Sequence, residues 1–219
     1  MVDYRFAALL LAAAATPALA QTAATSPEGS SFTGLRGEVF GGYNATVGEY
    51  NAGPASPIVS QHRHDYGGEA GLQAGYDYGF GRFVVGPFGS VALMTSDCDH
   101  NQGMPLCVRP QMELEGGLRA GAKMMNDRAL VYVKGAYVGT RFHFTDISTG
   151  PNAGLSDDSW HGGWRAGAGV EYALNPHLYV KAEYDYTRTH RFGLGQYGEG
   201  DTSLRDVRNS VLAGVGVRF

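Results

Sequence analysis

Between Leu35 and Phe219 the chain repeatedly alternates apolar and polar residues with a period of two, and this pattern constrains the fold more than any other feature. Side chains of an extended strand point alternately to opposite faces, so the period predicts strands with one apolar face. Eight alternating stretches can be counted, at residues 35–43, 68–78, 83–93, 112–123, 131–140, 160–172, 178–186 and 207–219. The sequence therefore predicts an all-β chain.

The connections between these stretches are short and long in turn. Tight turns rich in Gly, Asn, Asp and Pro are predicted at 79–82, 126–128 and 175–177, and long polar loops at 44–65, 96–110, 143–158 and 191–206. One end of the sheet then carries the short turns and the other end carries the loops. This is the arrangement of an antiparallel up-and-down sheet.

The last stretch, 207–219, would leave a row of unpaired backbone groups if it ended the sheet. The first stretch, 35–43, has the same parity and runs in the opposite direction. Pairing of the two closes the sheet, so the predicted fold is an eight-stranded antiparallel barrel. Pro87 lies in the third stretch and predicts a β-bulge or an irregular strand start there.

Alternation alone leaves open whether the apolar face lines the core of a soluble sandwich or lipocalin-like barrel, or faces lipid. The aromatic residues favour lipid, because they gather near the strand ends with Leu, Val, Ala and Gly between them. At the short-turn end they are Tyr76, Tyr78, Phe83, Tyr172 and Phe219. At the loop end they are Tyr43, Tyr137, Trp160, Trp164, Tyr184 and Tyr186. This distribution predicts a transmembrane β-barrel.

The opposite, polar face balances acids against bases along the strands. The acids are Glu38, Glu69, Asp77, Glu113, Glu115, Glu171, Glu183 and Asp185. The bases are Arg36, Arg119, Lys123, Lys134, Arg165, Lys181, Arg208 and Arg218. Such a set can pair across a narrow lumen, and we predict a charge network inside the barrel.

The first 34 residues divide into two segments. Residues 1–20 read as a cleavable secretory signal, with Arg5 ending a short n-region, an apolar run after it and small residues before Gln21. The alternative is a buried hydrophobic helix. Residues 21–34 are rich in Ser, Thr, Gly and Pro and are predicted to be a flexible N-terminal segment, so the barrel is predicted at 35–219.

The composition excludes one class of partner. The net charge of -4 has the wrong sign for a nucleic-acid binder, and no stretch clusters Lys and Arg with aromatic residues.

Cys98 and Cys107 are the only cysteines and both lie in one predicted loop. In an exported protein they are predicted to form a disulfide, the alternatives being two free thiols or a metal site.

Several runs of residues carry a resemblance to a known family: WRAGAGVEY at 164–172, YVK at 132–134 and 179–181, and VGVRF at 215–219. Over residues 35–219 the chain resembles the outer-membrane β-barrel domain family of Gram-negative bacteria. Members of that family resemble the OmpA transmembrane domain and small porin-like surface antigens. The resemblance implies an outer-membrane location and contact with outer-membrane lipid. By the same resemblance, Val215, Val217 and Phe219 are expected to form the signal that the barrel assembly machinery reads.

The sequence predicts neither a catalytic site nor a metal site. A lipid A deacylase of this shape would carry His-x-Ser on its lipid face, and none of the seven histidines has a Ser two residues on. His161 follows Ser159, but parity places both on the lumen side, so no enzyme is predicted. His62, His64 and Asp65, and also Asp97, Asp99 and His100, are read as solvated loop residues, although two His at i and i+2 could bind a metal. No cofactor is predicted.

Arg141 and Arg188 interrupt the apolar face at its loop end. An outward Arg is costly at the bilayer midplane and tolerated at the interface. They are candidates for contact with lipopolysaccharide phosphates, the alternative being ordinary rim residues.

The function predicted from these features is that of a structural, surface-exposed outer-membrane protein with four extracellular loops, supporting envelope integrity and surface interactions. A small-solute porin-like pore and an adhesion or host-interaction protein are the alternatives. The loop partner is not predicted.

Overall fold

The computed structural model describes residues 32–51, 62–96, 106–146, 156–190, 192–193 and 203–219. Its long strands are β1 Gly34–Asn51, β2 His62–Phe80, β3 Phe83–Ser96, β4 Leu106–Met124, β5 Ala129–Asp146, β6 Ser156–Ala173, β7 Leu178–Thr189 and β9 Ser203–Arg218. A two-residue strand, β8 Phe192–Gly193, pairs with the start of β9. Among the described residues, no helix is long and apolar enough to cross a membrane.

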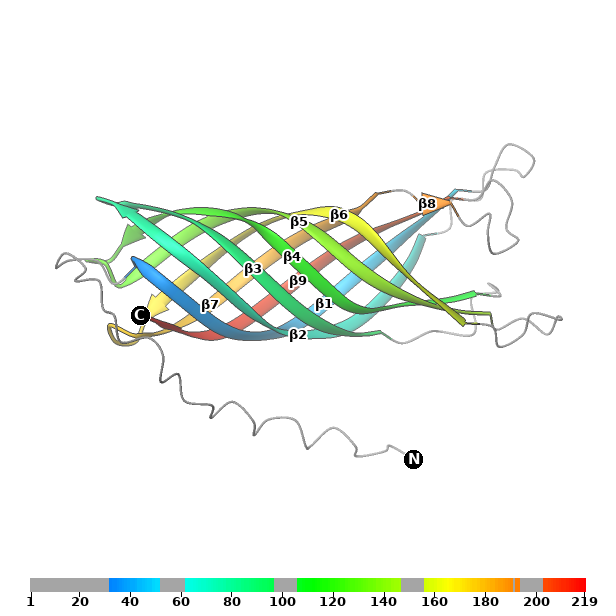
Figure 1. Ribbon diagram of the computed structural model, residues 1–219, viewed down its shortest axis with the longest axis horizontal. Coiled ribbons are helices and arrows are strands. Elements are labelled where there is room, and N and C mark those ends of the chain that lie inside the picture. Colours follow the sequence, from blue (N-terminus) through cyan, green and yellow to red (C-terminus); the bar gives the residue numbers. More distant parts are fainter. Residues whose placement is uncertain (1–31, 52–61, 97–105, 147–155, 191, 194–202) are drawn as a thin grey trace, which may run out of the picture.

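The long strands form a closed antiparallel barrel (Figure 1). Each pairs with the next long strand in the chain, and β1 also pairs with β9 from Arg36 opposite Arg218 to Asn51 opposite Ser203. The predicted fold class is confirmed. The closure removes both sheet edges, so the backbone groups of the final strand are paired and not exposed.

The strands extend further toward the loop end than the sequence predicts. The long strands include residues 44–51, 62–65, 96, 106–110, 143–146, 156–158 and 203–206, which the sequence predicts to lie in loops. About 9–11 tilted residues cross the hydrocarbon core. The extra residues therefore extend the barrel wall beyond the hydrocarbon core, where the outer face no longer has to be apolar.

Pro87 lies inside β3 rather than at its start, and no residue is inserted there. Gly75 opposite Phe88 and Tyr78 opposite Val85 keep the same register on either side of it, and Pro87 itself pairs with Leu118 of β4. The predicted bulge at Pro87 is therefore wrong. The register shift lies in β4, between Pro110 and Met112.

The three turns at the other end have local causes. Gly81 has a φ of 58°, which suits Gly, and Asn126 and Asp127 have φ of 53° and 63°, a region that Asn and Asp tolerate. In the third turn the Asn175 side-chain oxygen accepts hydrogen bonds from the backbone N–H groups of His177 and Leu178, at 2.9 and 2.8 Å.

The apolar face of the barrel points outward and the charged face points inward. Leu72, Val133 and Val211 are 57%, 61% and 64% exposed, whereas Arg36 and Glu171 are 1% and 0% exposed. A soluble barrel would have the reverse arrangement. The lipid-facing interpretation of the alternation is thus confirmed.

The first strand begins at Gly34, one residue before the predicted start of the barrel at Leu35. Gly34 already belongs to β1, and Phe32 is fully buried among Val84, Leu130 and Tyr132 at the short-turn end of the lumen. Burial of an aromatic ring outweighs the Ser- and Gly-rich composition around it. The lumen thus contains a residue from outside the strands.

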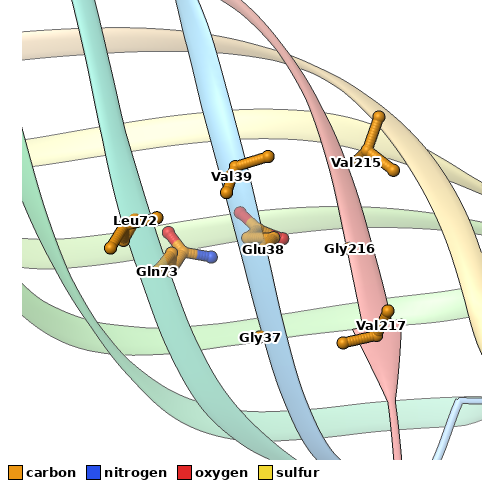
Figure 2. A pocket seen from close by; sticks show the side chains of 8 residues that line it. All are labelled: Gly37, Glu38, Val39, Leu72, Gln73, Val215, Gly216 and Val217. Carbon is orange, nitrogen blue, oxygen red and sulfur yellow. The ribbon is translucent and has the colours of Figure 1, made fainter. Parts of the chain in front are cut away.

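The seam between the first and last strands is tight at its short-turn end. The Phe219 N–H donates to the Leu35 carbonyl oxygen at 2.9 Å. On the other side of β9, the Arg218 N–H donates at 2.8 Å to the carbonyl oxygen of His177, in the turn before β7. Farther along, a shallow outer hollow lies over Gly37 between Val39, Leu72, Val215 and Val217 (Figure 2).

Gly34 and Gly37 offer a matched test of this seam. A Cβ at Gly34, whose φ is 122°, would lie 2.3 Å from the Phe219 carbonyl oxygen, whereas a Cβ at Gly37 would meet nothing within 4 Å. We expect Gly34→Ala to lower the free energy of unfolding in detergent micelles by about 1–3 kcal/mol. Gly37→Ala should leave it unchanged or slightly higher, and equal losses in the two variants would contradict this account of the seam.

Candidate functional site

The charged residues predicted for the lumen are all buried inside the barrel. The acids are Glu38, Glu69, Asp77, Glu113, Glu115, Glu171, Glu183 and Asp185, and the bases are Arg36, Arg119, Lys123, Lys134, Arg165, Lys181, Arg208 and Arg218. They project inward from seven of the long strands, β1, β2, β4, β5, β6, β7 and β9. Ion pairs join most of them into one chain.

At the loop end of the lumen, Glu113 is the centre of the network. Its carboxylate accepts hydrogen bonds from Arg165, from Arg208 and, at 2.9 Å, from the Thr140 hydroxyl. Arg165 also donates to Glu115 at 3.0 Å. Two guanidinium groups from β6 and β9 therefore share one carboxylate from β4.

In the middle of the lumen, Lys134 lies among three carboxylates. Its Nζ is 3.2 Å from Glu115 Oε1 and 2.9 Å from both Glu183 Oε1 and Asp185 Oδ2. Lys181 continues the chain, because its Nζ is 3.4 Å from Glu183 and also contacts Glu38.

At the short-turn end the chain of ion pairs continues to the last strand. Arg36 lies 3.3 Å from Glu38 and 3.5 Å from Asp77. Arg119 lies 2.5 Å from Asp77 and also contacts Glu171, which binds Arg218. A continuous path of alternating charge therefore runs through the barrel from Arg208 to Arg218.

Aromatic rings fill the space between the charges. Phe88 lies under Lys134 with 5.4 Å from Nζ to the ring centroid, and Phe40 lies under Lys181 at 5.1 Å. The Arg218 guanidinium lies 4.3 Å from the centroids of both Phe32 and Tyr179. Cation–π contacts of this kind strengthen when they are shielded from water.

Two tyrosine hydroxyls complete the interior. Tyr132 donates a hydrogen bond to Glu183, and Tyr179 donates to Glu38 at 2.7 Å. Parity places both rings on the polar face, but it does not say which acid they would bind. Phe32 had no signal in the sequence beyond being an aromatic residue in a polar segment.

Two further predicted members, Glu69 and Lys123, have other contacts. Among the described contacts, the Glu69 carboxylate accepts only from the neutral side chains of Asn44, at 3.4 Å, and Ser210, at 3.2 Å. Lys123 lies near the turn that follows β4, and its Nζ is 4.0 Å from Asp127. Glu69 lies near enough to Arg165 to interact with its charge without a hydrogen bond, whereas Lys123 lies at the short-turn end.

On the outer face, Arg141 and Arg188 lie at the loop ends of β5 and β7. Arg141 Nη2 is 2.6 Å from Asp158 Oδ2, and His143 Nδ1 is 2.8 Å from Asp158 Oδ1. Arg188 is half-buried and pairs across the ladder with Trp164. The two arginines are thus in the same region, but only Arg141 has an acidic partner among the described residues.

Ser159 and His161 lie where parity places them, on the lumen side near the loop end. The Ser159 Oγ is 2.7 Å from His161 Nε2, and the imidazole packs against the Phe142 ring with centroids 5.7 Å apart. The pair belongs to the wall of the lumen mouth.

Several predicted residues cannot be placed as sites. Cys98, Asp97, Asp99 and His100 lie outside the described residues, and only the backbones of Cys107 and His62–Asp65 are placed, in β4 and β2. The disulfide stays a prediction. Within the described part of the chain, no group of three or more His, Cys, Asp or Glu side chains could hold a metal ion.

The residues of the predicted assembly signal lie on the outer face of the closing strand. Val215 and Val217 are 46% and 41% exposed, and Phe219 is 62% exposed at the short-turn end. They are therefore accessible from outside the barrel, whereas the neighbouring Arg218 points inward.

Comparison with known proteins places this barrel. Residues 6–219 match the family described as "Outer membrane protein beta-barrel domain". The chain belongs to this family. It is a barrel of the outer membrane, and its charged face is the lumen of that barrel.

Individual relatives are more distant. The chain is 26% identical over 184 residues to the 25 kDa outer-membrane immunogenic proteins of Brucella abortus and Brucella suis, covering 82% of this chain and 78% of each relative. Among solved structures, Ail of Yersinia pestis is 15% identical, with a TM-score of 0.43 over 85% of this chain and 99% of that one. Neisserial surface protein A is 14% identical, with a TM-score of 0.45 over 83% and 97%.

The interior network can be tested with two isosteric substitutions. Glu113→Gln would leave Arg165 and Arg208 without their shared carboxylate, and loss of one partner from a buried pair costs about 3–5 kcal/mol. Glu69→Gln removes a carboxylate with neutral partners, so about 1 kcal/mol or less should be lost. Denaturant unfolding of both variants in detergent micelles measures the difference. Equal stabilities would show that the Glu113 cluster does not hold the barrel together.

Proposed function

We propose that this protein is a structural, surface-exposed component of the outer membrane that supports envelope integrity and presents four extracellular loops. The barrel serves as a rigid, sealed stem. The loops are its interaction surface, because loops on a rigid scaffold usually carry the variable contacts. The description of its relatives as immunogenic proteins of the outer membrane supports exposure of this part of the chain.

The observation that carries this proposal is the filled lumen. In a barrel of eight strands, side chains nearly fill the interior, and here the side chains form the chain of ion pairs from Arg208 to Arg218. The Lys134 group is an example: opening a path past it would separate one ammonium from the three carboxylates that surround it, which Arg165 and Lys181 also help to neutralise. Such a lumen opposes the free passage of solutes, which argues against the porin-like alternative.

The proposal includes a route to the membrane. The first 20 residues direct export and are removed, and the barrel assembly machinery then reads Val215, Val217 and Phe219. The exposed, alternating side chains of β9 suit recognition from outside the barrel. In the membrane the partner of the apolar face is lipid. No catalytic role is assigned.

A planar-bilayer recording tests the sealed lumen. The purified, folded protein should give no reproducible large open levels, because the charge network occupies the conduction path. The same preparation after boiling controls for detergent and for contaminating channels. Stable open levels that appear only with the folded protein would favour the pore instead.

Deletion of Phe219 tests the assembly role. We expect the deletion to reduce the amount of barrel in the outer membrane several-fold, while protein refolded in detergent keeps nearly the stability of the full chain. Arg82→Ala, a change in the exposed turn after β2, is the control for a substitution at the same end of the barrel. Membrane insertion of the deletion variant at the normal level would contradict the assembly signal.

A further inference from the structure

Strands β5, β6 and β7 are neighbours in the barrel wall (Figure 1). Their outer face carries cations beside aromatic rings at the loop end. Tyr137, Trp164 and Arg188 lie in one transverse row of the ladder, and Arg141 pairs with Trp160 farther from the turns. The Trp164 and Tyr186 rings pack with centroids 5.5 Å apart. Arg109 of β4 is exposed at the same end and pairs with His143.

This cluster lies at the level of the lipid headgroups. Arg188 is the tenth residue after Leu178, the first of β7, and Arg141 is the twelfth after Ala129, the first of β5. Since about 9–11 tilted residues cross the hydrocarbon core, both arginines reach its outer boundary or just beyond. Trp and Tyr occupy the same interface in membrane proteins.

Within its row of the ladder Arg188 is the one cation, since the row continues from Tyr137, Trp164 and Arg188 to Val207 of β9 and Val47 of β1. Other cations at the loop end lie on β4, β5 and β9, where Arg205 has the same outward parity as Val207. Arg188 differs from these in lying directly beside Trp164.

The two arginines differ in their availability. Asp158 binds both Arg141 and His143, and it is the one acid among the described outward side chains at the loop ends of β4–β7. Arg188 has no ion pair with any residue that the structure describes. An outward guanidinium beside Trp164 at the headgroup level therefore has its charge available to a ligand from the membrane.

We propose that this cationic face, formed by Arg188 and Arg141 with Tyr137, Trp160 and Trp164, binds the phosphate groups of lipopolysaccharide. Arg188 is the primary contact, because a guanidinium can bind a phosphate through two parallel hydrogen bonds. Arg141 is a secondary contact that Asp158 holds in part. The proposal rests on the outer-membrane placement in the proposed function, and is independent of whether the lumen conducts.

Affinity of the folded protein in detergent micelles for three lipids, each added as mixed micelles with the same detergent, tests the site: lipopolysaccharide, lipopolysaccharide stripped of its phosphates, and phosphatidylglycerol. Arg188→Ala should weaken binding to intact lipopolysaccharide about tenfold, as expected for loss of a charge-assisted contact. Arg82→Ala removes the same charge at the opposite end of the barrel and should change nothing. Gel mobility of each variant before and after boiling shows whether its barrel is folded. Arg188→Lys, which keeps the charge, is a second variant in case Arg188→Ala does not fold.

Asp158→Asn gives a prediction of the opposite sign. Releasing Arg141 and His143 from their acidic partner should strengthen binding to intact lipopolysaccharide several-fold. The gain should disappear when Arg141→Ala is added, because the two residues act as a pair.

Three results would overturn the proposal. They are unchanged affinity of folded Arg188→Ala, equal binding of intact and phosphate-free lipopolysaccharide, and an equal loss on phosphatidylglycerol, which would indicate a general attraction to anionic lipid. Weaker binding of Asp158→Asn would overturn the direct pairing of Arg141 with phosphate. A conducting lumen would refute the sealed-stem function and leave these affinities as they are.

Discussion

The structure depends on the neutralisation of charge inside a narrow closed barrel. A charge enclosed with little water is costly unless an opposite charge lies close to it. Here the partners come from strands that are distant in the chain: Arg208 of β9 binds Glu113 of β4, and Arg119 of β4 binds Glu171 of β6. Barrel closure and charge pairing therefore require one another.

This dependence gives the last residues of the chain a role in both. Arg218 binds Glu171 on the inside and lies against Phe32 and Tyr179, while the Phe219 N–H binds Leu35 across the seam. Backbone pairing and interior pairing are completed by neighbouring residues of β9. A chain that has not yet placed β9 against β1 lacks an edge partner and, through Arg208, also one cation of the Glu113 cluster.

The sequence was sufficient for the parts of the fold that depend on local periodicity. The period of two identified every long strand, and the balance of Arg, Lys, Asp and Glu on one face identified the lumen. It could not give the pairs, because which arginine meets Glu113 depends on the tilt of the strands around the barrel. Strand ends such as Asn51 were missed because beyond the lipid nothing requires an apolar face.

The candidate sites were also predictable only in part, because the sequence gives the face of each residue but not its contacts. Parity placed Ser159 and His161 in the lumen, and Arg141 and Arg188 outside. Only the structure shows that Asp158 forms an ion pair with Arg141. Phe32 was missed because its burial depends on a cavity that only the closed barrel forms.

Alternation also keeps the two faces of each strand chemically independent. In β6, Trp164 belongs to the outer cationic face while its neighbour Arg165 belongs to the lumen network. A substitution at Trp164 changes contact with lipid and leaves the Glu113 cluster intact. A substitution at Arg165 disrupts the Glu113 cluster and leaves the contact with lipid unchanged. Since the backbone between them is fixed by ladders on both sides, the ion pairs of the interior constrain the inner residues alone. The outer face of the same strands is left free to adapt to the surrounding membrane.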